Sequence, residues 1–170
     1  MVMKATNASE KAKKIRLLFT DCDGVLTDTG VYYSDRGEEL KRFSLRDGMG
    51  VERLRDLVHV ETGIISGEDI HLLRRRAEKL NISEVHLGIK NKIKCIRGIA
   101  TKYNISVKEI AYIGDDINDV EVMETVGISA CPADATEFAV NAADIVCSSN
   151  GGFGAFREFA EFIINAKLTN

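Results

Sequence analysis

Short apolar runs alternate with segments of helical spacing along most of this chain. The runs have the length of β-strands, and the segments between them carry apolar residues three and four positions apart, as amphipathic helices do. Strands that alternate with helices form a mostly parallel sheet covered on both faces. We therefore predict a Rossmann-like α/β fold. The predicted strands are 15–19, 60–65, 85–87, 110–113, 127–131 and 145–147, and the predicted helices are 47–58, 69–80, 90–103, 116–126, 136–142 and 154–168.

A pair of β-rich stretches interrupts this alternation after the first strand. Residues 30–34 and 39–43 are separated by Asp35-Arg36-Gly37, which is typical of a hairpin with a glycine-containing loop. We expect this hairpin to project over the strand ends. Residues 1–14 are polar and basic, so we predict a flexible amino terminus followed by one domain over residues 15–170.

The composition indicates a small-molecule partner. The 23 basic and 26 acidic residues give a net charge of −3, which argues against general binding to nucleic acids or anionic membranes. No apolar run approaches the roughly 20 residues that span a bilayer, and the first residues lack the apolar core of a secretory signal. The four cysteines form no CxxC pair, so no zinc site is indicated. We expect a cytoplasmic protein with no nucleic-acid or membrane partner.

Two carboxylates, Asp21 and Asp23, end the first predicted strand and are followed at once by Gly24. Ligand sites of open α/β sheets lie at the carboxyl ends of strands, and the glycine allows a sharp turn there. One carboxylate could attack phosphorus while the other moves protons. The same string is also common in turns and calcium loops, but Val25 and Leu26 place apolar side chains where a calcium loop needs oxygen ligands.

Polar side chains follow two further predicted strands. The carboxyl ends of parallel strands converge, and acids held that close repel one another unless a cation neutralises them. Oxygen ligands without a nearby histidine or cysteine favour Mg²⁺ as that cation. The residues concerned are Asp21 and Asp23 on the first strand, Ser66 on the second, and Asp115, Asp116 and Asp119 on the later one.

Two residues could hold a phosphate group. Ser66, before Gly67, could offer its hydroxyl and nearby backbone N–H groups to an anion, or it could be a simple helix N-cap. Lys92 could place its ammonium among phosphate oxygens, or it could be a solvated helix lysine. Each signal is weak when taken alone.

The order of these signals is specific. An Asp-x-Asp-Gly string, Ser-Gly after a second strand, a helix lysine and Gly-Asp-Asp-x-x-Asp follow one another, and over residues 14–165 the chain resembles the haloacid dehalogenase superfamily. The direct step through the hairpin to residues 43–48 leaves no room for a cap domain. In this, and in the glycine-rich residues 151–158, the chain resembles the capless phosphatases of 3-deoxy-octulosonate 8-phosphate and nonulosonate 9-phosphates. Those enzymes are homotetramers in which the hairpins assemble and a neighbouring subunit completes each pocket.

The resemblance implies a role for each motif residue. Hydrolysis would proceed through an aspartyl-phosphate intermediate with Mg²⁺ as cofactor. Asp21 matches the nucleophile, which is also a metal ligand, and Asp23 matches the acid/base that also offers its backbone carbonyl to the metal. Asp115 matches the second metal carboxylate, and Ser66 and Lys92 match the pair that holds the phosphate. Asp116 and Asp119 match the acids that bind or orient the metal shell.

The substrate expectation depends on two positions. The octulosonate enzymes usually carry arginine at the position of Glu68, whereas Glu68 together with Lys79 resembles a 2-keto-3-deoxynonulosonate 9-phosphate phosphatase. Three helical turns separate the two residues by about 16 Å, so we expect Lys79, with Arg76, to reach a neighbouring subunit's pocket unless it belongs to a solvated basic face. Arg46 and Asp47 are further expected substrate contacts.

Three other interpretations remain open. One is an octulosonate 8-phosphate phosphatase, which Glu68 argues against. Another is a non-catalytic tetramerisation domain related to the end of sialic-acid cytidylyltransferases, although such domains tend to lose the catalytic Asp pair. A third is a phosphorelay receiver, which the position of Asp21 and Asp23 on the first strand fits poorly.

Overall fold

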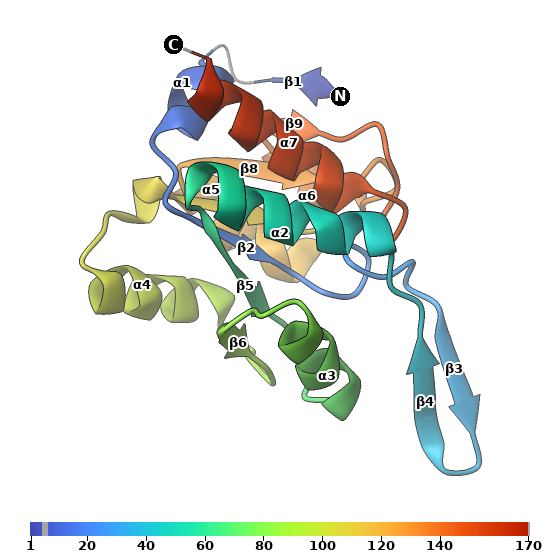
Figure 1. The fold of residues 1–170 in the computed structure, drawn as a ribbon. Helices are drawn as coiled ribbons and strands as arrows, with labels where there is room; N and C mark the ends of the chain where they lie inside the picture. Colours follow the sequence, from blue (N-terminus) through green and yellow to red (C-terminus); the bar gives the residue numbers. More distant parts are fainter. Residues whose placement is uncertain (5–6, 170) are drawn as a thin grey trace.

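A seven-stranded sheet, described here from a computed structural model covering residues 1–4 and 7–169, organises the chain (Figure 1). Its strand order is β1-β9-β8-β7-β2-β5-β6, and every neighbouring pair is parallel except β1 with β9. The predicted α/β fold is confirmed. The strands are β1 Val2–Met3, β2 Leu17–Thr20, β5 Glu61–Ile65, β6 Glu84–His86, β7 Ile110–Ile113, β8 Ile128–Cys131 and β9 Ile145–Val146.

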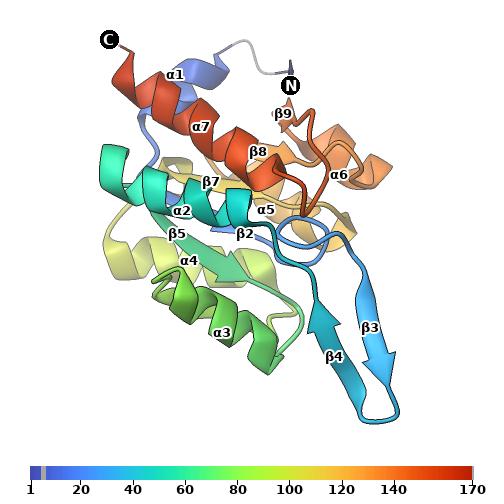
Figure 2. The ribbon, with the colours of Figure 1, turned by 45° about the vertical axis from the view of Figure 1, so that its right-hand side comes forward.

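Helices cover both faces of the sheet because neighbouring strand residues point in opposite directions. Leu18 belongs to the apolar core under α1, α2, α3 and α7, whereas Phe19 belongs to the core under α4, α5 and α6. Figure 2 shows α2 and α7 packed side by side over one face. None of the described helices has the length and apolar character that a bilayer crossing requires. The helices are α1 Ala8–Lys13, α2 Leu45–Val58, α3 His71–Lys79, α4 Lys92–Tyr103, α5 Val120–Thr125, α6 Glu137–Ala142 and α7 Ala155–Leu168.

The predicted hairpin is present and extends away from the body of the domain (Figures 1 and 2). It consists of β3 Val31–Ser34 and β4 Gly37–Lys41. The pairing register changes between Tyr32, which faces Leu40, and Tyr33, which faces Glu38. Glu39 is therefore an extra residue in β4, which is the arrangement of a β-bulge.

The amino-terminal segment differs from the sequence expectation of a flexible tail over residues 1–14. Strand β1 pairs with β9, and helix α1 buries Ala8 and Ala12 in the core shared with α7. Two alanines four positions apart form a narrow apolar stripe that is easily overlooked among polar neighbours. The helix belongs to the folded domain; residues 5–6 lie outside the described residues.

Candidate active site

The carboxyl ends of three adjacent strands border one polar cavity of about 440 Å³. Asp21 follows β2, Ser66 follows β5 and Asp115 follows β7, and all three side chains line this cavity. The backbone N–H of Asp21 donates to the carbonyl of Ile113 at 2.9 Å, so the sheet pairing continues to the cavity edge. The predicted convergence of these residues is found in the structure.

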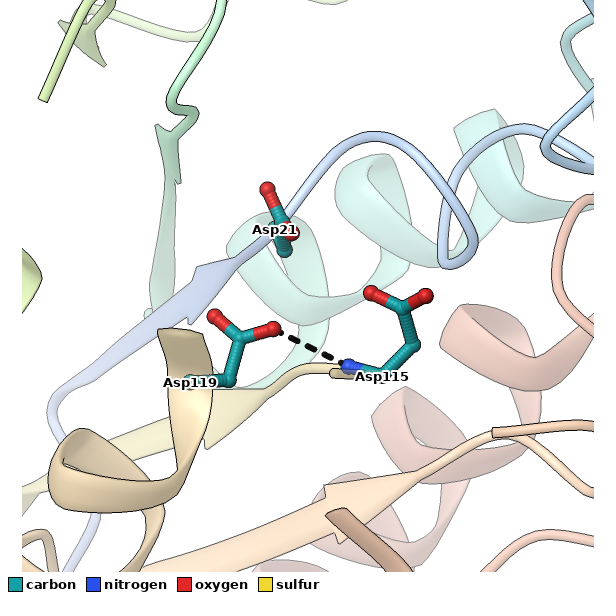
Figure 3. Close-up of side chains that lie close together, drawn as sticks. All are labelled: Asp21, Asp115 and Asp119. Atoms are coloured by element: carbon teal, nitrogen blue, oxygen red, sulfur yellow. Dashed lines mark hydrogen bonds between the residues drawn. The ribbon is translucent and has the colours of Figure 1, made fainter. Parts of the chain in front are cut away.

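Three carboxylates lie together at the base of the cavity (Figure 3). Asp21, Asp115 and Asp119 each offer an oxygen within 4.8 Å of the others. Burial, followed by repulsion from Asp119, raises the pKa of Asp21 to about 7. Burial and repulsion from Asp21 raise the pKa of Asp115 to about 8. The positive charge near this cluster therefore does not balance the negative charge of its three carboxylates.

Lys92 is the cation of this cluster. Its Nζ lies 3.0 Å from Asp21 Oδ2 and 2.6 Å from Asp119 Oδ1, and its side chain is almost fully buried. Burial by itself would lower the pKa of Lys92, but the charges of Asp21 and Asp119 outweigh that effect and raise this pKa. The alternative of a solvated helix lysine is wrong.

Asp119 positions its neighbours more than it faces the cavity. It is fully buried, and it accepts hydrogen bonds from Lys92 Nζ, from the Tyr112 hydroxyl at 2.6 Å and from the backbone N–H of Asp115 at 3.1 Å (Figure 3). An oxygen of Asp119 is close enough to Asp21 and Asp115 to share a metal, but both carboxylate oxygens of Asp119 already accept hydrogen bonds from these donors. Asp119 therefore suits the predicted orienting role better than that of a direct ligand.

The remaining oxygens fit a divalent cation. Asp115 Oδ1 is buried without a hydrogen-bond partner among the described residues. Space for the acids depends on two glycines: a Cβ on Gly24 would lie 1.9 Å from Asp115 Oδ2, and one on Gly114 would lie 2.4 Å from Asp119 Cγ. Oxygen donors with excess negative charge are the ligand type that Mg²⁺ prefers. Asp21 and Asp115 are thus the carboxylates that could hold the metal.

Asp116 lies at the rim of the cavity and is exposed. Its Oδ1 accepts from the backbone N–H of Ile117 at 2.6 Å and from Thr136 Oγ1 at 3.2 Å. It starts the short 3₁₀ turn Ile117–Asp119, which brings Asp119 close to Asp21 and Asp115.

Asp23 has a partner that the sequence analysis missed. Lys41 Nζ, from the hairpin, lies 2.8 Å and 2.7 Å from the two oxygens of Asp23, and Thr27 Oγ1 donates to Oδ1 at 3.2 Å. Burial tends to lower the pKa of Lys41, but its bonds with Asp23 and Glu38 raise that pKa. No local motif marks Lys41, because its contact depends on where the base of the hairpin, at the end of β4, places this side chain.

Ser66 lines the cavity and is buried. It is not the N-cap of the following helix, because α3 begins at His71 with Ile70 as its N-cap. Its Oγ instead accepts from the backbone N–H of Glu68 at 3.1 Å, in a turn that also brings Gly67 and Glu68 to the cavity wall. The N-cap interpretation is wrong, and the hydroxyl borders the space where an anion would lie.

Only Glu68 among the predicted substrate contacts lines the cavity. Arg46 is exposed at the start of α2, and Lys79 is exposed at the end of α3. Asp47 is buried and accepts from the backbone N–H of Arg157 at 2.9 Å, and burial raises its pKa.

Arg76 is likewise occupied within its own chain. It donates to the carbonyl of Ser44 at 2.7 Å, and its guanidinium lies 5.4 Å from the centre of the Phe43 ring. Within one chain, then, Asp47 and Arg76 pack α2 against its neighbours, which differs from the expected contact with substrate.

Comparison with known proteins gives a consistent set of relatives. Residues 70–156 match the family model of haloacid dehalogenase-like hydrolases. The chain is 39% identical to the 3-deoxy-D-manno-octulosonate 8-phosphate phosphatase KdsC of Salmonella typhi. This match extends over 163 residues and covers 96% of this chain and 86% of that protein.

Solved structures of similar proteins have the same fold. The octulosonate 8-phosphate phosphatase of Moraxella catarrhalis, in complex with magnesium, phosphate and the sugar acid KDO, superposes with a TM-score of 0.92 at 32% identity, over 96% of this chain and 94% of that one. The cobalt-bound phosphatase of Haemophilus influenzae superposes with a TM-score of 0.88 at 38% identity, over 92% of this chain and 91% of that one.

Proposed function

This chain belongs to the haloacid dehalogenase-like hydrolases, and from that premise we propose that it is a Mg²⁺-dependent phosphatase of a 2-keto-3-deoxy sugar acid phosphate. One observation carries the proposal: the Lys92 ammonium joins Asp21 and Asp119, and an unpartnered oxygen of Asp115 lies in the same cluster. This arrangement supports phosphoryl transfer to a carboxylate. It also argues against a non-catalytic tetramerisation domain.

The substrate that the relatives support is 3-deoxy-D-manno-octulosonate 8-phosphate. Relatives at 37–40% identity over more than nine-tenths of this chain are named as phosphatases of that compound. This corrects the order of preference from the sequence, which placed a nonulosonate 9-phosphate first. We therefore put the octulosonate first.

A nonulosonate 9-phosphate remains the second candidate because of Glu68. This carboxylate lies at the cavity wall, where it can accept hydrogen bonds from sugar hydroxyls. It would repel a sugar carboxylate placed beside it, whereas an arginine there would bind one. The charge at position 68 thus bears directly on which sugar acid the cavity accepts.

The first step would be attack of Asp21 on phosphorus. The Asp21–phosphorus bond forms, the bond from phosphorus to the sugar oxygen breaks, and that oxygen keeps the bonding electrons and takes a proton from Asp23. Lys92 lies where it can neutralise both the nucleophile and the phosphoryl oxygens, and Ser66 borders the same space. Mg²⁺ held by Asp21 and Asp115 would supply further positive charge to those oxygens.

The second step would return the enzyme to its starting state. Water gives a proton to Asp23 while its oxygen bonds to phosphorus, and the Asp21–phosphorus bond breaks to release phosphate. Asp23 thus handles the proton in both steps. Asp23 lines the same cavity as Asp21.

We also propose that the chain assembles as a homotetramer through its hairpins. The side chains of Tyr32 and Leu40, which pair across the strands, are exposed on a hairpin that extends away from the domain (Figure 2). Exposed aromatic and aliphatic side chains grouped in this way are typical of protein interfaces. Lys79 could then reach a neighbouring pocket, as the sequence suggested. Sedimentation equilibrium would measure the assembly, and a monomer at all concentrations would contradict it.

Steady-state phosphate release from both sugar acid phosphates with Mg²⁺ tests the function. We expect the octulosonate 8-phosphate to have the higher kcat/KM. A higher value for the nonulosonate 9-phosphate would support the second candidate instead. Release from neither compound would overturn the proposed function.

A further inference from the structure

One face of the hairpin forms a wall of the active-site cavity. Val31 and Tyr33 of β3 and Glu38 and Lys41 of β4 all line it. The register pairs Val31 with Lys41 and Tyr33 with Glu38, so these four side chains form two cross-strand pairs on a single face. The hairpin therefore has an inner face that belongs to the active site.

The bulge at Glu39 makes this face possible. Glu38 and Lys41 are three residues apart, and in a regular strand residues at that spacing point to opposite sides. An extra residue in one strand shifts the alternation by one position. Because Glu39 is that extra residue, the side chains of Glu38 and Lys41 point the same way, with Nζ 3.2 Å from Oε1.

Lys41 connects the hairpin to the proton-transfer residue. The Lys41 side chain is only 2% exposed, and its Nζ contacts both oxygens of Asp23, at 2.8 Å and 2.7 Å. Glu38 is the second anion on the same ammonium, although Oε1 makes no well-directed hydrogen bond. A buried cation between two carboxylates restricts the orientation of both.

We propose that Lys41 is a positioning residue that reaches from the hairpin and holds the Asp23 carboxyl group where it can exchange a proton with the leaving oxygen and with water. The inference rests on the proposed function, because it assigns Lys41 a part in the same reaction. Lys41 itself transfers no proton and forms no bond to phosphorus. Its effect is exerted through the placement of Asp23.

The choice of leaving group tests this role. An alkoxide needs a proton as it leaves, whereas p-nitrophenolate is stable as an anion and leaves without one. For Lys41→Met we expect the rate of enzyme phosphorylation, measured by rapid quench, to fall about 100-fold with the sugar acid phosphate and by less than about 3-fold with p-nitrophenyl phosphate. The inhibition constant of vanadate should stay unchanged, because Lys92 and Ser66 still hold the phosphoryl group.

Two further variants serve as controls. Lys41→Arg keeps a cation that can contact both Asp23 oxygens and should restore most of the lost rate. Arg36→Met removes an exposed cation near the hairpin tip, which pairs with Glu39 and does not contact Asp23, and should leave both rates unchanged. Equal losses with both substrates, or no loss with either, would overturn the inference.

A measurement without catalysis separates this inference from the proposed function. Asp23→Ala removes the anchor of Lys41, so amide hydrogen exchange over residues 31–41 should become faster, whereas Asp21→Asn should leave it unchanged. Equal exchange in both variants would show that Asp23 and Lys41 do not hold each other. If the wild-type chain hydrolyses no sugar acid phosphate, the proposed function is wrong. The hydrogen exchange of the two variants still decides whether Lys41 and Asp23 are in contact.

Discussion

The two ends of the cavity are built differently. At the phosphate end, Asp21, Lys92 and Asp119 are buried, and Lys92 from α4 pairs with both of these acids. At the sugar end, Glu68 is exposed and the hairpin extends into the surroundings. The chemistry of phosphoryl transfer is thus fixed by groups adjacent to the backbone of one rigid sheet. In the proposed reaction, the choice of sugar would depend on side chains that can change without disturbing the fold.

The same contrast appears in how charge is stabilised. Desolvation makes an unpaired charge costly at the phosphate end, so Lys92 is bonded to two acids. Near the sugar end, water screens Glu68 and the Arg74–Asp69 pair, which contributes little to stability. Substitutions at the first end should therefore abolish the reaction, and substitutions at the second should adjust it.

The largest expected effect is that of Asp21→Asn. An amide cannot attack phosphorus, so turnover should fall by at least about 10⁴-fold, as when other covalent nucleophiles are removed. The fold should persist, since the amide retains the size of the side chain. Steady-state kinetics and circular dichroism would measure both, with Asp56→Asn on the exposed face of α2 as a control. Activity close to that of the wild type would remove Asp21 from the mechanism.

An intermediate effect concerns pH and metal. The folded-state pKa values of Asp21, about 7, and Asp115, about 8, lie above the ordinary value of 3.8. At pH values between the ordinary pKa and these raised pKa values, the folded protein binds more protons than the unfolded chain. The metal-free protein should therefore lose stability as the pH rises from about 4 to about 8. Mg²⁺ binds the ionised carboxylates, so its stabilising effect should increase over the same range.

Thermal unfolding at pH 5, 6.5 and 8, with EDTA or with Mg²⁺, would check this prediction. Asp115→Asn provides the control, because it removes one of the two titrating groups and should flatten the curve obtained with EDTA. A metal-free protein whose stability increased up to pH 8 would contradict the proposed state of the cluster.

The smallest effect is expected at the sugar end. Glu68→Gln should raise the KM of the preferred sugar acid phosphate about 10-fold, the cost of losing one charge-assisted hydrogen bond. Hydrolysis of p-nitrophenyl phosphate should not change, since that compound presents no sugar hydroxyls. Asp69→Asn, at the exposed neighbouring position, is the matched control. A loss shared by both substrates would place Glu68 at the phosphate end and would contradict the separation of the cavity into two ends.

The phosphate end was largely predictable because each of its residues follows a strand or starts a helix. A short apolar run, a carboxylate and a glycine are local signals, and parallel strands bring their ends together wherever they lie in the sequence. Such signals made Asp21, Asp115 and Lys92 candidates, although each signal was weak when taken alone. The order of the motifs then made the family recognisable.

The sugar end was harder to predict because its contacts are not local. Lys41 reaches Asp23 only through a bulge that no residue pattern in β4 marks, and Arg76 turns back to Ser44 instead of facing outward. Asp47 looked like a substrate contact but is buried against the start of α7. In each case a tertiary contact that no local pattern encodes decides where the charged side chain lies.

The bulge at Glu39 also constrains how the hairpin can vary during evolution. Deleting this residue would remove the bulge and leave Glu38 and Lys41 two positions apart in a regular strand, so both side chains could still face the active site. A change that made β4 regular but kept all its residues would instead turn Glu38 and Lys41 to opposite faces, whereas length changes at the tip, between Ser34 and Gly37, would leave the inner face intact. Homologous chains should therefore differ in hairpin length at the tip, and near Lys41 they should keep either a three-residue spacing with a bulge or a two-residue spacing without one, even where the sequence itself has diverged.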